Sequence, residues 1–273
     1  LYDQGTVSIP EDGIIFQPPT FVGVVDGISG LYIPSEGSMM FGGRSGGQFA
    51  THILCLSFAQ ASLEESLEDV LQIATTVLAE NIRKRGLNLD HSELLPSASF
   101  SIVKITEKEI TILQAADSLA IWQTSDGKIG ATANRFFKVE SQNIRDIAEL
   151  MQKHGGNREK MWFEFRPILA KRRRQWVNKP GGYALFNGQP EARDYWQKFV
   201  LPRGEVVLLL LFTDGLVPFV ETLDMEFLGM RIVRYYHKEG LPAILRRTRH
   251  IEAKRKEISH IDHAEATAIA IEF

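Results

Sequence analysis

The sequence predicts an α+β protein in which antiparallel β-sheets carry helices on their outer faces. Strand-like and helix-like runs come in groups, without the steady strand–helix alternation of a parallel sheet. Residues 97–133 show a period of two, with turn residues between short apolar runs, as in an antiparallel meander. Two more apolar runs, residues 21–27 and 207–212, read as buried strands that end at or just before Asp-Gly. We therefore expect a single domain over residues 1–273.

Composition is that of an ordinary globular chain. The 273 residues are 44% hydrophobic and 24% charged, which is enough to bury a sizeable core. The net charge of −3, from 31 basic and 34 acidic residues, gives no reason to expect nucleic acid or a membrane surface as the main partner. Cys55 is the one cysteine, so an intramolecular disulfide and a thiolate metal cluster are both excluded.

No segment of the sequence predicts membrane insertion or export. The longest uninterrupted apolar run, residues 206–212, is far too short to cross a bilayer. A secretory signal pattern is also absent. We expect a cytoplasmic location.

The first elements are strands joined by an acidic turn. We expect strands over residues 5–8 and 13–17, and Pro18-Pro19 ends the second because proline lacks the amide donor of a β-ladder. Glu11 and Asp12 lie in the turn between them, where a solvated turn is the simplest interpretation. The buried strand over residues 21–27 follows.

Two helices come next. A glycine-rich loop, residues 38–47, leads into a helix over residues 48–61; the loop lacks the Gly-Lys-Ser/Thr ending of a nucleotide site, but Arg44 could bind an anion there. Ser62 and Glu65 form a capping-box pattern that predicts the start of a second helix. Its apolar spacing continues to Ile82, and Gly86 stops it.

The meander then predicts strands with an acid between them. These strands cover residues 100–105, 110–114 and 119–123, and the last enters a hairpin at Ser125-Asp126-Gly127-Lys128. Asp126 is best explained as a turn residue. Asp117 stands between two strands, an unusual place for an acid.

The remaining chain alternates helices with two strands. We expect helices over residues 144–154, 158–171 and 190–199, a strand over 207–212, a helix pair over 216–249 and a closing strand over 266–273. Residues 171–183, which include Arg172, combine cations, aromatics and turn formers. They are either a solvated helix end or a loop that offers cations to an anionic substrate.

The two strands that end in Asp-Gly suggest a metal site. Buried strands that end in acids bring Asp26 and Asp214 to the edge of a core. Carboxylate oxygens are hard ligands, so this pair suits Mg²⁺ or Mn²⁺.

Five motifs in a fixed order extend this hypothesis. They are Glu11-Asp12, Val25-Asp26-Gly27, Ala116-Asp117-Ser118, Phe212-Thr213-Asp214-Gly215 and Glu265-Ala266-Thr267. This order resembles the metal-dependent protein phosphatase 2C (PPM) family over nearly the whole chain. The resemblance implies a four-layer αββα sandwich, two antiparallel β-sheets flanked by helices, with a metal site between the sheets.

The resemblance also implies roles for single residues. Asp26 would bridge two Mn²⁺ or Mg²⁺ ions, Glu11 and the Gly27 carbonyl would bind one of them, and Asp214 the other. Asp12 would support water in the first or second shell of the metals, and Asp117 resembles an acid that recruits a third ion. The expected metal-binding set is therefore Glu11, Asp12, Asp26, Gly27, Asp117, Asp214 and Glu265, with catalysis carried by Asp26, Asp214 and Asp12 and substrate phosphate bound by Arg44 and Arg172.

The sequence departs from the family pattern near its end. Ala264 and Glu265 stand where the family has Asp-Asn or Asp-Asp, so one ligand on the Asp214 side is missing. Glu265 is longer by one methylene and could reach in; Asp262 or His263 could also substitute. Elsewhere Ile28 replaces a histidine of many members, Ala116 replaces a glycine, and residues 1–10 lack the expected arginine.

Two functions remain open at this point. The first is a metal-dependent phosphatase acting on phosphoserine and phosphothreonine in a phosphorylated protein, by attack of a water shared between two metals. The second is a pseudophosphatase, a binding or regulatory module with an incomplete metal site. Substituting Ala264→Asp distinguishes them.

Overall fold

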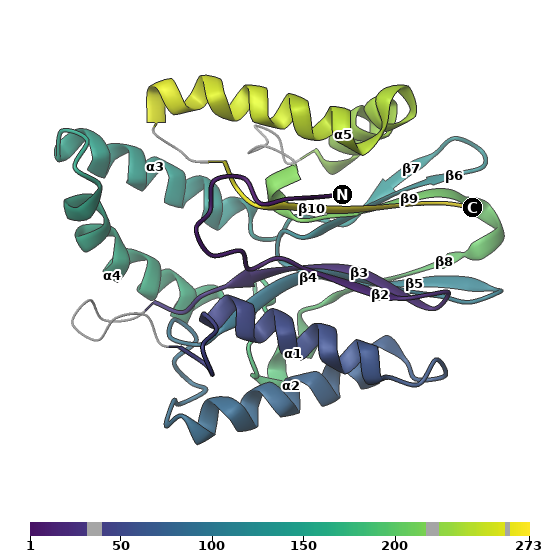
Figure 1. Ribbon diagram of the computed structural model, residues 1–273, viewed down its shortest axis with the longest axis horizontal. Coiled ribbons are helices and arrows are strands. Elements are labelled where there is room, and N and C mark those ends of the chain that lie inside the picture. The colour runs from purple at the N-terminus through teal and green to yellow at the C-terminus, as the bar shows by residue number, and fades with distance from the viewer. Residues whose placement is uncertain (32–39, 217–223, 260–262) are drawn as a thin grey trace.

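The computed structural model describes residues 1–31, 40–216, 224–259 and 263–273. Two five-stranded sheets lie face to face, with helices outside both, which confirms the predicted αββα sandwich (Figure 1). Every strand pair in the two sheets is antiparallel.

The first sheet, here called the β3 sheet, has the strand order β2-β3-β4-β5-β8. Its strands are β2 (Gly13–Gln17), β3 (Phe21–Ile28), β4 (Ser97–Ile105), β5 (Glu109–Ala115) and β8 (Gln197–Pro202). The second, the β9 sheet, has the order β1-β10-β9-β6-β7. Its strands are β1 (Tyr2–Asp3), β10 (Ala266–Glu272), β9 (Val206–Phe212), β6 (Leu119–Thr124) and β7 (Ile129–Ala131).

Both Asp-Gly strands are interior strands of their sheets. Strand β3 pairs with β2 and β4, and β9 pairs with β10 and β6. Their side chains face the other sheet on one side and helices on the other, so both strands are apolar along almost their whole length. Between the sheets, Val22 and Val24 of β3 belong to the same buried cluster as Leu209 and Leu211 of β9.

Helices α1 (Gly46–Gln60) and α2 (Leu67–Lys84) cover the β3 sheet. Helix α2 starts later than expected, because Ser66 is its N-cap and its Oγ accepts the Asp69 N–H at 3.1 Å. The Ser62–Glu65 pair forms its predicted hydrogen bond, at 2.6 Å, but closes a separate turn. One half of the predicted capping box therefore forms, in a turn that precedes the helix.

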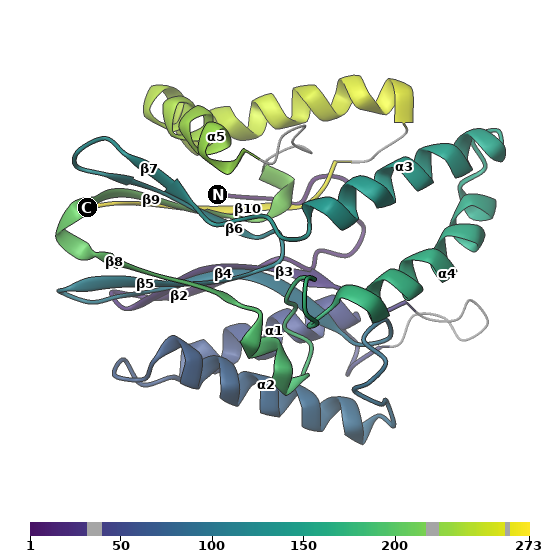
Figure 2. The same ribbon diagram turned by 180° about the vertical axis from the view of Figure 1, so that it is seen from behind.

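Helices α3 (Phe137–Lys153) and α4 (Arg158–Trp176) form a pair that projects from one end of the sandwich (Figures 1 and 2). Helix α3 begins well before residue 144, where the sequence had suggested its start. Asn134 Oδ1 accepts the N–H of Phe137 at 2.9 Å, so an asparagine three residues earlier prepares this first turn.

One strand prediction and one helix prediction were wrong. Residues 5–8 are not a strand; the N-terminal strand is the short β1, which pairs with β10. Residues 190–199 are not one helix: a 3₁₀ turn, Pro190–Asp194, is followed by β8. Strand β8 alternates buried or half-buried with exposed residues and pairs with β5 along its length, so tertiary pairing overrides the helical start.

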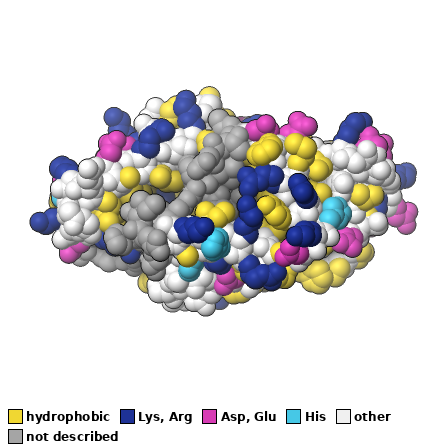
Figure 3. Space-filling view, turned by 90° about the horizontal axis from the view of Figure 1, so that it is seen from above, with side chains coloured by type: hydrophobic (Ala, Val, Ile, Leu, Met, Phe, Trp, Pro, Cys, Tyr) yellow, Lys and Arg dark blue, Asp and Glu magenta, His cyan; other side chains and the backbone are white. Residues whose placement is uncertain are grey.

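Helix α5 (Met225–Ser259) covers the β9 sheet and breaks at Gly240, whose φ is 74°, so it is a pair of helices as predicted. Its bounds differ from the expected 216–249: residue 216 ends a 3₁₀ turn, residues 217–223 lie outside the described residues, and the helix continues to Ser259. Its buried side chains Leu228, Ile232 and Ile244 pack on that sheet. Arginine and lysine side chains are prominent on the face seen from above (Figure 3). Within the part of the chain that the structure describes, no helix is long and apolar enough to cross a membrane.

Candidate metal centre

Asp26, near the end of β3, is the residue around which the predicted acids gather. Burial raises its pKa well above the ordinary range, and the charges of Asp214, Asp12, Asp117 and Glu11 raise it further. Like charges have this effect only when they lie close together. The fold therefore brings acids from both sheets toward one place.

Asp12 lies in the turn before β2 and reaches the β9 sheet. Its Oδ2 accepts the hydroxyl of Thr213, at 2.9 Å, and the Thr213 Oγ1 accepts the backbone N–H of Thr267, also at 2.9 Å. Burial, together with the charges of Glu265 and Asp214, raises the pKa of Asp12 to about 7. Asp12 thus connects the first turn to the end of β9.

Asp117 occupies the corner between β5 and β6. Its side chain is 6% exposed, and its Oδ1 has no hydrogen-bond partner among the described residues. Burial and the charge of Asp214 raise its pKa to about 7. Ala116, just before it, has φ of 56°, a left-handed conformation that favours glycine, so the chain holds Asp117 in place at a cost in strain.

Asp214 opens the 3₁₀ turn Asp214–Leu216 that follows β9. Loss of solvation inside the protein raises the pKa of Asp214, and the charge of Glu252 raises it further. The hydrogen bond from the Gly215 N–H lowers the pKa in part. The residue nevertheless keeps an exposed face. It is therefore the acid of this group that solvent reaches most readily.

Glu140, on the first turn of α3, is an acid that the sequence analysis missed. Burial and the charges of Asp117 and Asp214 raise its pKa to about 8. The neighbouring Val139 packs with Ala116 in a small buried cluster, which fixes this turn against the Asp117 corner. The signal was Asn134, which marks an earlier helix start than the apolar period suggested.

Glu11 points away from Asp12, toward the start of α1. Its Oε1 accepts hydroxyl hydrogen bonds from Ser29, at 2.7 Å, and from Ser45, the N-cap of α1. A Cβ added to Gly47 would lie 2.5 Å from the Glu11 carboxyl carbon, so glycine is needed there. Hydroxyl groups and the helix terminus therefore stabilise this carboxylate.

Close backbone contacts also require glycine at position 27. A Cβ added there would lie 2.7 Å from the carbonyl oxygen of Glu11 and 2.7 Å from that of Gly47. Strand β3, the acidic turn and α1 therefore meet backbone to backbone. The metal-binding role of the Gly27 carbonyl stays a prediction.

Ala264 lies where the family pattern places an acid. A Cβ added to Gly215 would lie 3.3 Å from the Ala264 Cβ, so a side chain at position 264 would neighbour the Asp214 turn. Of the proposed substitutes, His263 is engaged elsewhere. His263 pairs through Nδ1 with Glu252 Oε2 at 2.8 Å, and Asp262 lies outside the described residues.

Glu265 is buried but engaged elsewhere. Its Oε1 accepts the Tyr2 hydroxyl at 2.8 Å, and its Oε2 accepts the backbone N–H groups of Glu11, at 2.7 Å, and of Asp12, at 3.1 Å. A carboxylate offers about four acceptor positions, so most of them are used. This geometry does not favour the metal-ligand role expected for Glu265.

The two arginines expected to bind phosphate are placed differently. Arg172 is committed to α3: Nη1 donates to Asn143 at 2.7 Å and Nη2 to Asp146 at 2.5 Å. These two contacts pack α4 against α3, and the phosphate-binding role expected for Arg172 stays a prediction. Arg173, one position on, donates from Nη1 to the Ser29 carbonyl at 3.0 Å, beyond the end of β3. Arg44 is exposed just ahead of α1.

The carboxylate oxygens of this group fit a hard divalent cation, although they do not converge into a coordination shell. Asp12, Asp26, Asp117 and Asp214 supply carboxylate oxygens whose raised pKa values mark a local excess of negative charge. The unpartnered, buried Asp117 Oδ1 is an acceptor that a cation would satisfy. Among the described residues, no three acidic, histidine or cysteine side chains converge enough to hold one metal ion.

Comparison with known proteins places the fold but gives no close relative. No family model matches the sequence, and no curated protein does. Solved structures match over the whole chain. The serine/threonine phosphatase PstP/Ppp of Mycobacterium tuberculosis aligns with a TM-score of 0.58 at 13% identity, covering 100% of this chain and 96% of that one.

Two more bacterial structures agree. Serine/threonine phosphatase Stp1 from Staphylococcus aureus has a TM-score of 0.55 at 16% identity, covering 100% of this chain and 93% of its own. PppA, a key regulatory component of T6SS in Pseudomonas aeruginosa, has a TM-score of 0.56 at 14% identity, with 100% and 96% covered. Another structure of the PstP catalytic domain is a complex with 2 manganese ions. The chain therefore has the protein phosphatase 2C fold that these bacterial enzymes share.

Proposed function

We propose that this chain is a divergent member of the PPM family that hydrolyses phosphoserine and phosphothreonine in a cytoplasmic phosphoprotein, using Mn²⁺ or Mg²⁺. The observation that carries the proposal is the gathering of Asp12, Asp26, Asp117 and Asp214 on a phosphatase 2C fold. Four mutually repelling carboxylates cost free energy unless positive charge or protons neutralise them. The PstP domain, with the same fold, holds two manganese ions.

The residues would divide the work as follows. Asp26 and Asp214 would hold two divalent cations between them, with Asp12 and the Gly27 carbonyl beside them and Asp117 and Glu140 near a further ion. These cations supply Lewis-acid activation of the phosphoryl group and of water. Asp12, oriented by the Thr213 hydroxyl, would orient the attacking water by hydrogen bonding. Arg44 would bind the phosphate from the exposed loop before α1.

The test is hydrolysis of p-nitrophenyl phosphate and of a phosphothreonine peptide, with Mn²⁺, with Mg²⁺ and with chelator. We expect turnover with metal, none with chelator, and loss of turnover in Asp26→Ala. Asp126→Ala is a matched control, because Asp126 lies in the exposed β6–β7 turn. Metal-independent turnover, or turnover that survives in Asp26→Ala, would refute the proposal.

A second function, that of a pseudophosphatase, is favoured by a specific observation. Ala264 leaves the Asp214 turn without the acid that the family pattern supplies, and Glu265 is engaged by other donors. Such a module would bind a phosphorylated partner without turnover. Saturable binding of the phosphothreonine peptide by a folded, metal-loaded protein that releases no phosphate would select this function.

A further inference from the structure

We propose that Glu265 is a positioning residue: its carboxylate fixes the backbone of Glu11-Asp12 and so sets where Asp12 and Glu11 reach. Its effect on metal affinity and turnover rests on the proposed function. Its effect on the backbone does not. The proposal replaces the ligand role that the sequence suggested for Glu265.

The Glu265 carboxylate holds the backbone of Glu11 and Asp12 by two hydrogen bonds, here called the clamp. One oxygen, Oε2, accepts two successive backbone N–H groups, from Glu11 at 2.7 Å and Asp12 at 3.1 Å. Successive N–H groups that converge on one anion form a compact binding geometry for a carboxylate. The other oxygen accepts the Tyr2 hydroxyl at 2.8 Å, and Glu265 as a whole is 9% exposed.

The clamped backbone lies where two site residues diverge. From this point the Asp12 carboxyl reaches Thr213 at the end of β9, while the Glu11 carboxyl reaches Ser29 beyond the end of β3. One residue thus extends to each sheet. Because a carboxyl moves with its backbone, loss of the clamp would displace both acids together.

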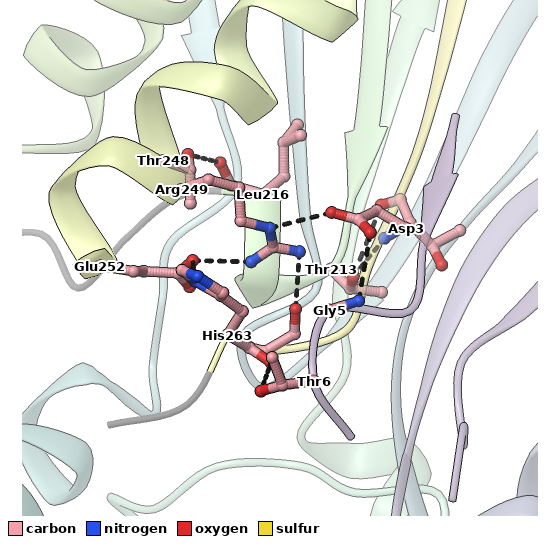
Figure 4. A network of polar contacts seen from close by, with 11 residues as sticks. Asp3, Gly5, Thr6, Thr213, Leu216, Thr248, Arg249, Glu252 and His263 are labelled. Atoms are coloured by element: carbon pink, nitrogen blue, oxygen red, sulfur yellow. Dashed lines mark hydrogen bonds and ion pairs between the residues drawn. The ribbon is translucent and has the colours of Figure 1, made fainter. Parts of the chain in front are cut away.

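The chain on both sides of the clamp is also held, as Figure 4 shows. Arg249 donates from Nε to Asp3 at 2.9 Å and from Nη2 to the Ala264 carbonyl at 2.7 Å. The His263 carbonyl accepts the Thr6 hydroxyl at 3.2 Å and the Thr6 N–H at 3.0 Å. Residues 263–265 therefore bind the N-terminal segment at several points, and Glu265 makes the contact nearest the acids.

Two variants separate positioning from metal ligation. In Glu265→Gln the amide oxygen can accept both N–H groups, and its NH₂ can donate to the Tyr2 hydroxyl, so the clamp survives without the charge. In Glu265→Ala the clamp is lost. Tyr2→Phe is the control, since it removes the third donor and leaves both backbone contacts.

The first measurement is amide hydrogen exchange at Glu11 and Asp12, followed by NMR without added metal. We expect Glu265→Ala to speed exchange by about tenfold or more, since a hydrogen bond to a charged acceptor is lost. We expect Glu265→Gln and Tyr2→Phe to stay within about threefold of the parent chain. Unchanged exchange in Glu265→Ala would overturn the proposal. If Glu265→Ala does not fold, the parent chain decides: exchange at Glu11 and Asp12 as fast as at exposed amides would overturn the proposal.

The second measurement is Mn²⁺ affinity by calorimetric titration. We expect Glu265→Ala to weaken it about tenfold and Glu265→Gln to keep it within about threefold. A Glu265→Gln variant that keeps slow exchange but loses Mn²⁺ as fully as Glu265→Ala would show a ligand and overturn the proposal. If the parent chain neither binds Mn²⁺ nor hydrolyses phosphate while the exchange pattern holds, the clamp stands and the phosphatase proposal falls.

Discussion

At the scale of single residues, Ala264 is the departure from the family pattern that lies beside the Asp214 turn. It neighbours the Asp214 turn, and it is too small to offer a ligand. Nearby carboxylates are supplied by Asp12, Asp26 and Asp117, whose charges already disfavour one another. An added acid can therefore help only if a cation is there to bind it.

Substituting Ala264→Asp should tighten Mn²⁺ binding by about tenfold or more and raise phosphatase turnover, because a new carboxylate would face the Asp214 side of the site. Calorimetry and phosphate release measure the two effects. Ala264→Asn is the matched control, with the same size and no charge. If both variants leave affinity and turnover unchanged, position 264 does not face the metals.

The main acids could be predicted from the sequence because their signal is local. Asp26 and Asp214 follow apolar strands and precede glycine, and strand geometry brings such residues to the edge of a core. The contacts of Glu265 and Arg172 could not be predicted. Each depends on a partner distant in sequence, Glu11 for the first and Asp146 for the second, and no local pattern identifies that partner.

At the scale of elements, the N-terminus of α1 decides how the acidic turn packs. Ser45 caps the helix and also donates to Glu11, and the absence of a side chain at Gly47 leaves room for the Glu11 carboxyl. The same loop carries Arg44. The helix, the acidic turn and the end of β3 thus form one packed unit.

A Gly47→Ala substitution should disturb this unit, since the added Cβ would lie 2.5 Å from the Glu11 carboxyl carbon. We expect a loss of about 1–3 kcal/mol in the free energy of unfolding and weaker Mn²⁺ binding. Urea unfolding measures the first, with Gly204→Ala, whose Cβ meets nothing within 4 Å, as control. Equal stability of the two variants would contradict the described packing.

The sequence predicts the type of an element correctly where its apolar periodicity is strong. The prediction fails where pairing with a distant strand decides the structure. The apolar spacing of α2 and the alternation of β4 to β6 gave their type correctly. Strand β8 was missed because its proline- and acid-rich lead-in resembles a helix start, while β5 supplies the partner that makes it a strand. The start of α2 was predicted too early because two serines four residues apart both make contacts typical of a helix cap.

At the scale of the whole molecule, the sandwich forces acids from opposite sheets into one region, and its stability should respond to pH. The folded protein raises the pKa of Asp12 and of Asp117 to about 7 and of Glu140 to about 8. Unfolded carboxyls titrate near 4. Between these values the folded state binds more protons, so its stability falls as pH rises.

Without metal, the melting temperature should therefore drop by at least about 4 °C between about pH 5.5 and about pH 8. Saturating Mn²⁺ should remove or reverse this drop, because the cation favours the ionised carboxylates. Calorimetric scans with chelator and with Mn²⁺ measure both slopes. Asp117→Asn should show a smaller drop in chelator. A melting temperature that is flat or rises with pH in chelator would rule out the mutual repulsion inferred here.

If the acids around Asp26 form a site for divalent cations, titration of Mn²⁺ into the parent chain and into Asp26→Asn will show it. The asparagine keeps the size of the side chain and removes the charge at the middle of the cluster. We expect the parent chain to bind Mn²⁺ and Asp26→Asn to bind it more weakly by more than about tenfold. Equal affinity in the two proteins, or a folded parent chain that binds no Mn²⁺ at millimolar concentration, would contradict it.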